Sequence, residues 1–138
     1  MIEHSIKEGL STVYEKETTT GDAYSSTNAD AGTLDYLVST PSIITMIIDA
    51  AADMLDQLLP PDYITVGKKI ELIHEQPSLV GEKIILKLEV KKLEGNSVLL
   101  NIEAKDSKGQ ICSGIYERMI INKDKLLNIA YERSPELI

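Results

Sequence analysis

The stretch TPSIITMIIDAAADMLDQLLPP, residues 40–61, decides the fold of this chain. Threonine is a good N-cap and proline is favoured at the first helical position, so we expect a helix over residues 41–59 that Thr40 caps. Pro60 and Pro61 end this helix, because proline cannot continue one. The spacing predicts a polar stripe of Thr45, Asp49, Asp53 and Asp56 and a broad apolar face of Ile44, Ile47, Ile48, Ala51, Leu55 and Leu58. We expect a sheet to cover so apolar a helix.

Apolar and polar side chains alternate with a period of two on both sides of this helix, which predicts strands. We expect these strands at residues 10–19, 63–76, 82–94, 97–106 and 109–121. The short breaks between the later strands are typical of hairpins and favour an antiparallel meander. Residues 18–35 are predicted to form a long loop, and the tail after the last strand has weak helical character. The predicted fold class is therefore α+β, with an antiparallel sheet wrapped around one long central helix.

The composition argues against several classes of protein. The chain has 138 residues, which we assign to a single domain over 1–138. Its 22 Asp and Glu against 14 Lys and Arg give a net charge of −8, which disfavours binding to nucleic acid or to an anionic membrane. With 1 cysteine and 2 histidines, we expect neither a disulfide framework nor a metal site.

A cytoplasmic location is expected for this chain. The N-terminus, MIEHSIKEGL, lacks the basic start and the apolar run of a signal peptide. The longest apolar stretch, inside residues 41–59, is interrupted by Asp49, Asp53 and Asp56 and cannot span a bilayer. The single thiol, Cys112, agrees with a reducing compartment.

Two polar side chains are candidates for catalysis. His74 has the same parity in its strand as Ile70 and Leu72, so we expect it to face the helix. There it is either a core histidine bonded to a backbone carbonyl or a general acid or base. Thr40 is either an N-cap alone or a hydroxyl that positions a carbonyl, a carboxylate or a water, since a helix N-terminus favours negative charge.

Asp49 and Cys112 complete the set of candidates. Asp49 lies four residues before Asp53, which fits either a solvated helix surface or a pair of carboxylates. Cys112 has no basic neighbour in sequence and is expected to be a small strand residue. The chain contains no glycine-rich phosphate loop and no nucleophile elbow. No bound cofactor is therefore expected.

Three segments share an order and spacing with a known family. These segments are VSTPSIITMIIDAAADML at 38–55, TVGKKIELIHEQPSLVGEKI at 65–84 and CSGIYERMIINKDKL at 112–126. Together they resemble the fluoroacetyl-CoA thioesterase-like branch of the hot-dog fold thioesterases. The strongest marks of the resemblance are Ser39-Thr40-Pro41, Gly67 with His74 seven residues later, and Ser113-Gly114-x-x-Glu117-Arg118.

The resemblance implies a homodimer whose two sheets join, with active sites at the interface that hydrolyse a short acyl-CoA. CoA enters such a site as part of the substrate. Carried over, Thr40 and His74 match catalytic residues. Gly67 matches the glycine near the thioester carbonyl and Arg118 an arginine of the last strand, so both are predicted to bind substrate. Since the chain has no Phe, the candidates to line the acyl pocket are Leu34, Tyr36 and Leu37.

One position departs from the family pattern. The family's catalytic glutamate follows the threonine by eight residues, and that position is Ile48 in this chain. Either Asp49, one residue later, takes the glutamate's place as a catalytic residue, or the chain lacks this carboxylate. The first alternative predicts a thioesterase, and the second a non-catalytic protein that binds acyl-CoA or another small ligand. A hot-dog hydratase is disfavoured, because its Asp-x-x-Pro-x-His pattern is absent.

Overall fold

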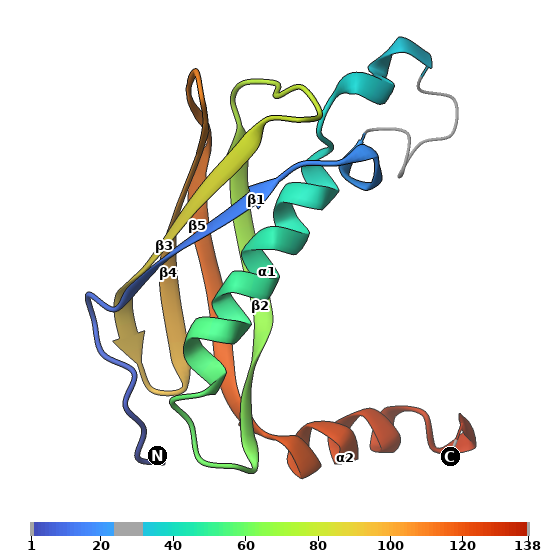
Figure 1. The fold of residues 1–138 in the computed structure, drawn as a ribbon. Coiled ribbons are helices and arrows are strands. Elements are labelled where there is room, and N and C mark those ends of the chain that lie inside the picture. Colours follow the sequence, from blue (N-terminus) through green and yellow to red (C-terminus); the bar gives the residue numbers. More distant parts are fainter. Residues whose placement is uncertain (1, 24–31, 138) are drawn as a thin grey trace.

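The computed structural model describes residues 2–23 and 32–137 (Figure 1). Its strands are β1 (Ser11–Glu17), β2 (Tyr63–His74), β3 (Lys83–Glu94), β4 (Ser97–Asp106) and β5 (Gly109–Asn122). Its helices are α1 (Thr40–Asp56) and α2 (Lys123–Arg133), with short 3-10 helices η1 (Thr20–Asp22), η3 (Gly32–Tyr36) and η4 (Pro135–Leu137). Each strand lies within two residues of its predicted range, and the predicted α+β class is confirmed.

The five strands form one antiparallel sheet in the order β1-β3-β4-β5-β2. The hairpins β3–β4 and β4–β5 form the predicted meander. β2 lies outside this meander and pairs with β5 instead. The connection over residues 75–82 is long enough to cross the end of the sheet, so β2 lies at one edge and β1 at the other.

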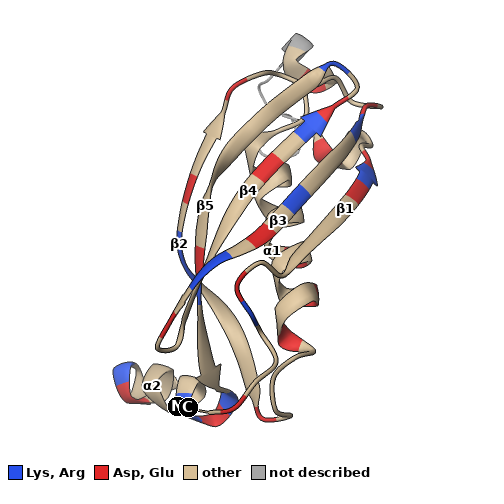
Figure 2. Cartoon of the chain, turned by 90° about the vertical axis from the view of Figure 1, so that its left-hand side faces the viewer, with Lys and Arg blue, Asp and Glu red and all other residues tan. Residues whose placement is uncertain are grey.

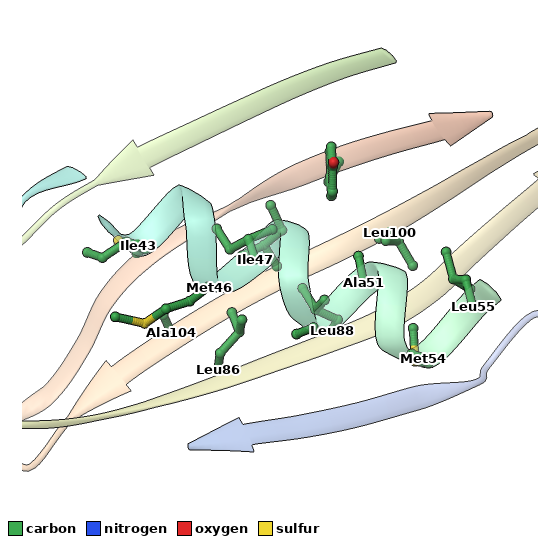
Figure 3. Close-up of a cluster of buried hydrophobic side chains, with 14 of the residues drawn as sticks. Ile43, Met46, Ile47, Ala51, Met54, Leu55, Leu86, Leu88, Leu100 and Ala104 are labelled. Carbon is green, nitrogen blue, oxygen red and sulfur yellow. The ribbon is translucent and has the colours of Figure 1, made fainter. Parts of the chain in front are cut away.

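α1 lies against one face of the sheet, and its buried side chains fill the space between the two layers (Figures 1 and 3). The buried residues of α1 are Ile43, Met46, Ile47, Ala50, Ala51, Met54 and Leu55. They belong to the same core cluster as Leu86, Leu88 and Leu100 of the sheet. Ile48 is 41% exposed, so its predicted place on the apolar face is wrong. The sheet covers one side of α1, and Ile48 is turned about 100° from the fully buried Ile47.

α1 ends at Asp56, three residues before the predicted end. The backbone N–H groups of Leu58 and Leu59 bond to the carbonyls of Leu55 and Asp56, so the chain tightens into a turn there. The residue before a proline is driven out of helical conformation, which explains why the helix ends ahead of Pro60.

The pairing of β2 with β5 contains a bulge between Gly67 and Lys69. The bulge shifts the alternation of side chains by one position. Thr65, before the bulge, is buried, whereas Lys68 is exposed although it has the parity of His74. The parity that predicts an inward-facing His74 therefore does not extend to residues before the bulge.

α2 follows β5 directly and projects from the base of the molecule (Figure 1). Asn122 caps it by accepting a hydrogen bond from the N–H of Lys125 at 3.1 Å. This helix confirms the predicted helical character of the tail. Over the described residues, no helix is both long and apolar enough to cross a membrane.

Candidate active site

The first turn of α1 meets the last residue of β2. The hydroxyl Oγ1 of Thr40 lies 2.7 Å from Nδ1 of His74, a hydrogen bond between two side chains 34 positions apart in sequence. The structure thus brings together two of the residues that the sequence predicts to be catalytic. Their contact lies at the N-terminal end of α1, where free N–H groups and the helix dipole favour negative charge.

The N-cap of α1 is Ser39 and not Thr40, contrary to prediction. The hydroxyl Oγ of Ser39 accepts a hydrogen bond from the N–H of Ser42 at 3.2 Å. Both residues precede the proline and both are good caps, so the sequence alone does not separate them. Because Ser39 caps the helix, the hydroxyl of Thr40 is available to His74.

The second ring nitrogen of His74, Nε2, is the atom of the pair that can exchange a proton. Nε2 is buried and, among the described residues, has no hydrogen-bond partner. If the Thr40 hydroxyl donates to Nδ1, then Nε2 carries the proton; if Nδ1–H donates, then Nε2 is an acceptor. Thr40 therefore holds the ring in either tautomer, while Nε2 is left to exchange a proton with a bound group.

Cys112 lies directly across the sheet from His74. Burial, together with the negative charge of Glu75, raises the pKa of the Cys112 thiol to about 12. The thiol is therefore protonated near neutral pH and is not a nucleophile. Glu75 itself accepts a hydrogen bond from the hydroxyl of Ser113 at 2.6 Å.

The backbone carbonyl of Asp22, a residue that is itself buried, anchors the chain just before Thr40. The carbonyl of Asp22 accepts the N–H of Ser39 at 2.8 Å, and its carboxylate lies 2.8 Å from Nζ of Lys16. Burial opposes ionisation of Asp22, but the hydrogen bonds from Lys16 and from the N–H of Thr19 outweigh it. The pKa of the Asp22 carboxyl is consequently held below its ordinary value of 3.8. Sequence reasoning did not identify this anchor, because a lysine and an aspartate six positions apart are common.

Gly67 and Arg118 form a second cluster, near the other end of β2. They are partners in the β2–β5 pairing. A side chain at position 67 requires Tyr116 to shift, since a Cβ there would lie 2.8 Å from the hydroxyl Oη of Tyr116. That hydroxyl accepts a hydrogen bond from Nη1 of Arg118 at 2.6 Å. The close approach of the Tyr116 hydroxyl thus explains why position 67 is a glycine.

The guanidinium of Arg118 is bonded within the chain. Arg118 is only 4% exposed, and it donates to the hydroxyl of Thr65 at 2.8 Å and to the carbonyl of Thr65 at 2.6 Å. The Thr65 hydroxyl in turn donates to the carboxylate of Asp56 at 2.6 Å. Arg118 thus lies in a polar network at the C-terminal end of α1. Its predicted contact with substrate stays a prediction.

The two clusters are far apart within one chain. Gly67 and His74 are seven residues apart on the same strand, a distance of roughly 23 Å at 3.3 Å per residue. A short thioester cannot span this distance. One chain therefore does not bring Thr40 and His74 together with Gly67 and Arg118.

Comparison with known proteins identifies the family. A family model described as "FlK: Fluoroacetyl-CoA-specific thioesterase" matches residues 18–124, well over half of the chain. The chain belongs to this family. The resemblance seen in the sequence is therefore confirmed. No curated protein sequence matches the chain significantly.

Solved structures show that this FlK-family chain has the hot-dog fold, as predicted. A hot-dog-like protein from Thermanaerovibrio acidaminovorans is 27% identical, with a TM-score of 0.85 over 92% of each chain. A hypothetical protein of Thermus thermophilus, described as a thioesterase superfamily member, is 22% identical with a TM-score of 0.85 over 96% of each chain. The fluoroacetyl-CoA thioesterase FlK is 16% identical, with a TM-score of 0.84 over 95% of this chain and 99% of its own.

Asp49 lies away from the Thr40–His74 pair of this FlK-family chain. It follows Thr40 by nine residues, which places it about 13 Å further along the axis of α1 and on the opposite side of the helix. Among the described residues, no hydrogen bond joins Asp49 to Thr40 or His74. Ile48, at the family's glutamate position, exposes its apolar side chain instead. The catalytic role of Asp49 stays a prediction.

Two of the predicted pocket residues lie close to Thr40 in sequence and are exposed. Leu34 and Tyr36 are exposed on η3, and Leu37 pairs with Leu79 of the β2–β3 connection. The N–H of Val80 also donates to the carbonyl of Tyr36 at 2.8 Å. Sequence reasoning missed Leu79, which lies in the connection between two predicted strands. Over residues 2–23 and 32–137, no group of His, Cys, Asp and Glu could hold a metal ion.

Proposed function

We propose that this FlK-family chain hydrolyses the thioester bond of a small acyl-CoA to give a free acid and CoA. The observation that carries the proposal is the Thr40–His74 hydrogen bond, which holds the imidazole at a helix N-terminus and leaves Nε2 buried and free. A general base needs such a nitrogen within reach of the attacking water. Family membership supports the same reaction class.

In the proposed reaction, Nε2 of His74 takes a proton from a water as its oxygen bonds to the thioester carbonyl carbon. The carbon–sulfur bond of the tetrahedral intermediate then breaks, and the imidazolium returns the proton to the departing thiolate sulfur. If a carboxylate attacks in place of water, it forms an anhydride with the acyl group and releases CoA. The same base then activates the water that hydrolyses this anhydride to the free acid. Thr40 and the N–H groups at the start of α1 position the acyl group. Backbone N–H groups near Gly67 hold the negative charge that develops on the carbonyl oxygen.

This mechanism needs two chains, and we propose a homodimer. β2 is an edge strand, so its outer N–H and C=O groups are available to a second sheet. Antiparallel pairing of β2 with the β2 of a second copy can set Gly67 opposite the partner subunit's His74. Each such site takes Thr40 and His74 from one subunit and the neighbourhood of Gly67 and Arg118 from the other. The exposed Ile73 of β2 and Ile48 of α1 are then available for burial by the partner.

A second function is favoured by the departure at position 48. Ile48 supplies no carboxylate, and Asp49 lies on the opposite side of α1 from Thr40. A chain that has the substrate pocket but lacks the catalytic carboxylate would bind acyl-CoA, or another small ligand, without hydrolysing it. We place either activity in the cytoplasm, where CoA thioesters occur and where Cys112 stays reduced.

Thiol release from a panel of short and medium acyl-CoAs tests the two functions. We expect the wild type to release thiol and His74→Ala to be slower by about 100-fold or more, the usual contribution of general acid–base catalysis. His4→Ala is the matched control, because His4 only accepts the N–H of Ile6 at 3.1 Å. Unchanged turnover by a folded His74→Ala dimer would refute the role of His74.

The same panel decides between enzyme and binding protein. Absence of thiol release from every thioester, with acyl-CoA binding in a calorimeter, would replace the proposed reaction by the binding function. Ile48→Glu then tests whether the missing carboxylate at position 48 explains the absence of hydrolysis. A large gain in hydrolysis would show that the missing carboxylate limits the native site, and no gain would exclude this explanation.

A further inference from the structure

α2 presents an apolar face that its own chain does not cover. None of its residues is buried. Leu127, which is 49% exposed, and Tyr131 lie four residues apart and therefore share one side of the helix. Ile129 points elsewhere, into a groove that it lines with Met119 and Ile121 of its own chain. Neither Leu127 nor Tyr131 lines this groove.

A second exposed apolar surface lies at the opposite end of the molecule. We call it the rim, and it consists of Leu34, Tyr36 and Leu79. Tyr36 is 70% exposed and Leu79 61% exposed, although backbone hydrogen bonds fix both segments to each other. The rim adjoins the N-terminal end of α1, where Thr40 meets His74.

The proposed dimer brings these two surfaces together. α2 begins beside the start of β2, where the N–H of Lys123 donates to the carbonyl of Asp62 at 2.9 Å. An antiparallel register that sets Gly67 opposite the partner's His74 sets Tyr63 opposite the partner's Ser78. The root of α2 then lies beside the partner's connection 75–82, which carries Leu79 of the rim. Figure 2 shows α2 at the β2 side of the sheet, below β2 and β5.

The charges of the two surfaces are complementary. The segments that carry the rim, residues 32–39 and 75–82, contain three carboxylates, Asp35, Glu75 and Glu82, and no lysine or arginine. α2 carries three cations against two carboxylates in a chain whose net charge is −8. The basic residues of α2 are marked in Figure 2. Opposite charge on the two surfaces favours their contact and sets its orientation.

We infer that α2 of each subunit packs on the rim of the other, so that Leu127 and Tyr131 cover the partner's Tyr36 and Leu79. The inference rests on the proposed dimeric thioesterase and adds a contact to it. Each subunit then contributes a covering helix next to the Thr40–His74 pair of its partner. Hydrophobic burial drives the contact, because these are among the most exposed large apolar side chains of the described residues.

A pair of engineered cysteines tests the contact. Leu79→Cys and Leu127→Cys place thiols on the rim and on α2, and the native Cys112 is fully buried and does not interfere. Within one chain the two positions are at opposite ends of β2, a strand of 12 residues or roughly 40 Å, so no disulfide can join them there. We expect mild oxidation of the double variant to give covalently linked dimers on a non-reducing gel. A mixture of the two single variants should give them too.

A matched control pairs Leu79→Cys with Val13→Cys. Val13 is exposed on β1, at the edge of the sheet opposite to β2, and should give no crosslinked dimer. Light scattering on the same samples measures the oligomeric state, and it separates the proposed dimer from the proposed contact between α2 and the rim. A dimer in which the Leu79→Cys and Leu127→Cys pair does not crosslink would overturn the contact and leave the proposed function standing. A monomer at every concentration would overturn the contact and the proposed dimer together.

Discussion

Gly67→Ala should destabilise the protein through one identifiable hydrogen bond. A Cβ at position 67 would lie 2.8 Å from Oη of Tyr116, closer than such atoms approach in real structures. The ring cannot move away freely, because Tyr116 is buried and its hydroxyl is held by Arg118 at 2.6 Å. Relief of the clash therefore requires this hydrogen bond to lengthen or break.

The size of the destabilisation by Gly67→Ala follows from the charge on Arg118. A hydrogen bond to a charged group contributes about 1.5–3 kcal/mol, and its loss leaves a buried guanidinium donor without its partner. We therefore expect Gly67→Ala to lower the free energy of unfolding by about 2 kcal/mol. For a chain of 138 residues, that lowers Tm by roughly 7 °C. Thermal and urea unfolding measure both quantities.

Tyr116→Phe completes a double-mutant cycle. Alone it should cost about 2 kcal/mol, since it removes the acceptor of the same hydrogen bond. In the double variant the clash disappears, because the next nearest ring atoms lie 3.5 and 3.6 Å from the added Cβ, an ordinary contact. We expect the double variant to cost about as much as Tyr116→Phe alone. If the losses in free energy of unfolding of the two single variants add in the double variant, Gly67 is required for a reason other than the Tyr116 hydroxyl.

Two further changes test the surroundings of Thr40. Ser39→Ala should lower the free energy of unfolding by about 1 kcal/mol, because it removes the cap of α1, whereas Thr40→Ala should hardly change stability and should slow thiol release. The reverse pattern in urea unfolding would restore Thr40 as the cap. Asp22 has a folded-state pKa below 3.8, so its contribution to stability is present above that pH and is lost as the pH falls through the folded value. The Tm difference between wild type and Asp22→Asn should accordingly shrink below pH 3.8, and a difference that does not depend on pH would contradict the role of its charge.

The elements of the fold were predictable because each has a local signal. Alternation and turn residues located the strands, and Pro41 and Pro60 bracketed α1 to within three residues. The pairing of β2 was not predictable in this way. Which edge a strand joins depends on long-range packing, and the connection 75–82 contains nothing that distinguishes a hairpin from a crossing. The need for a glycine at position 67 likewise depends on Tyr116, which is 49 positions away.

The candidate site was partly predictable for the same physical reason. Thr40 and His74 each have a distinctive local position, at a helix start and at a strand end, and the structure brings them into contact. The groups that support them have no local signal. Asp22 acts on Ser39 through a backbone carbonyl, which every residue possesses, so no side-chain pattern indicates it. The burial of Arg118 among Thr65 and Tyr116 depends on the register of β2 and β5.

The separation of His74 from Gly67 along a single edge strand has a genetic consequence. Under the proposed pairing, a chain that lacks His74 and a chain whose backbone near Gly67 no longer holds the carbonyl oxygen are each inactive as homodimers. A mixed dimer of the two has one site with both defects and one site with neither. Two defective alleles in one cell would then complement each other, and each would remain recessive. Restored activity in a cell with both alleles would thus indicate that each catalytic centre is shared between two polypeptides.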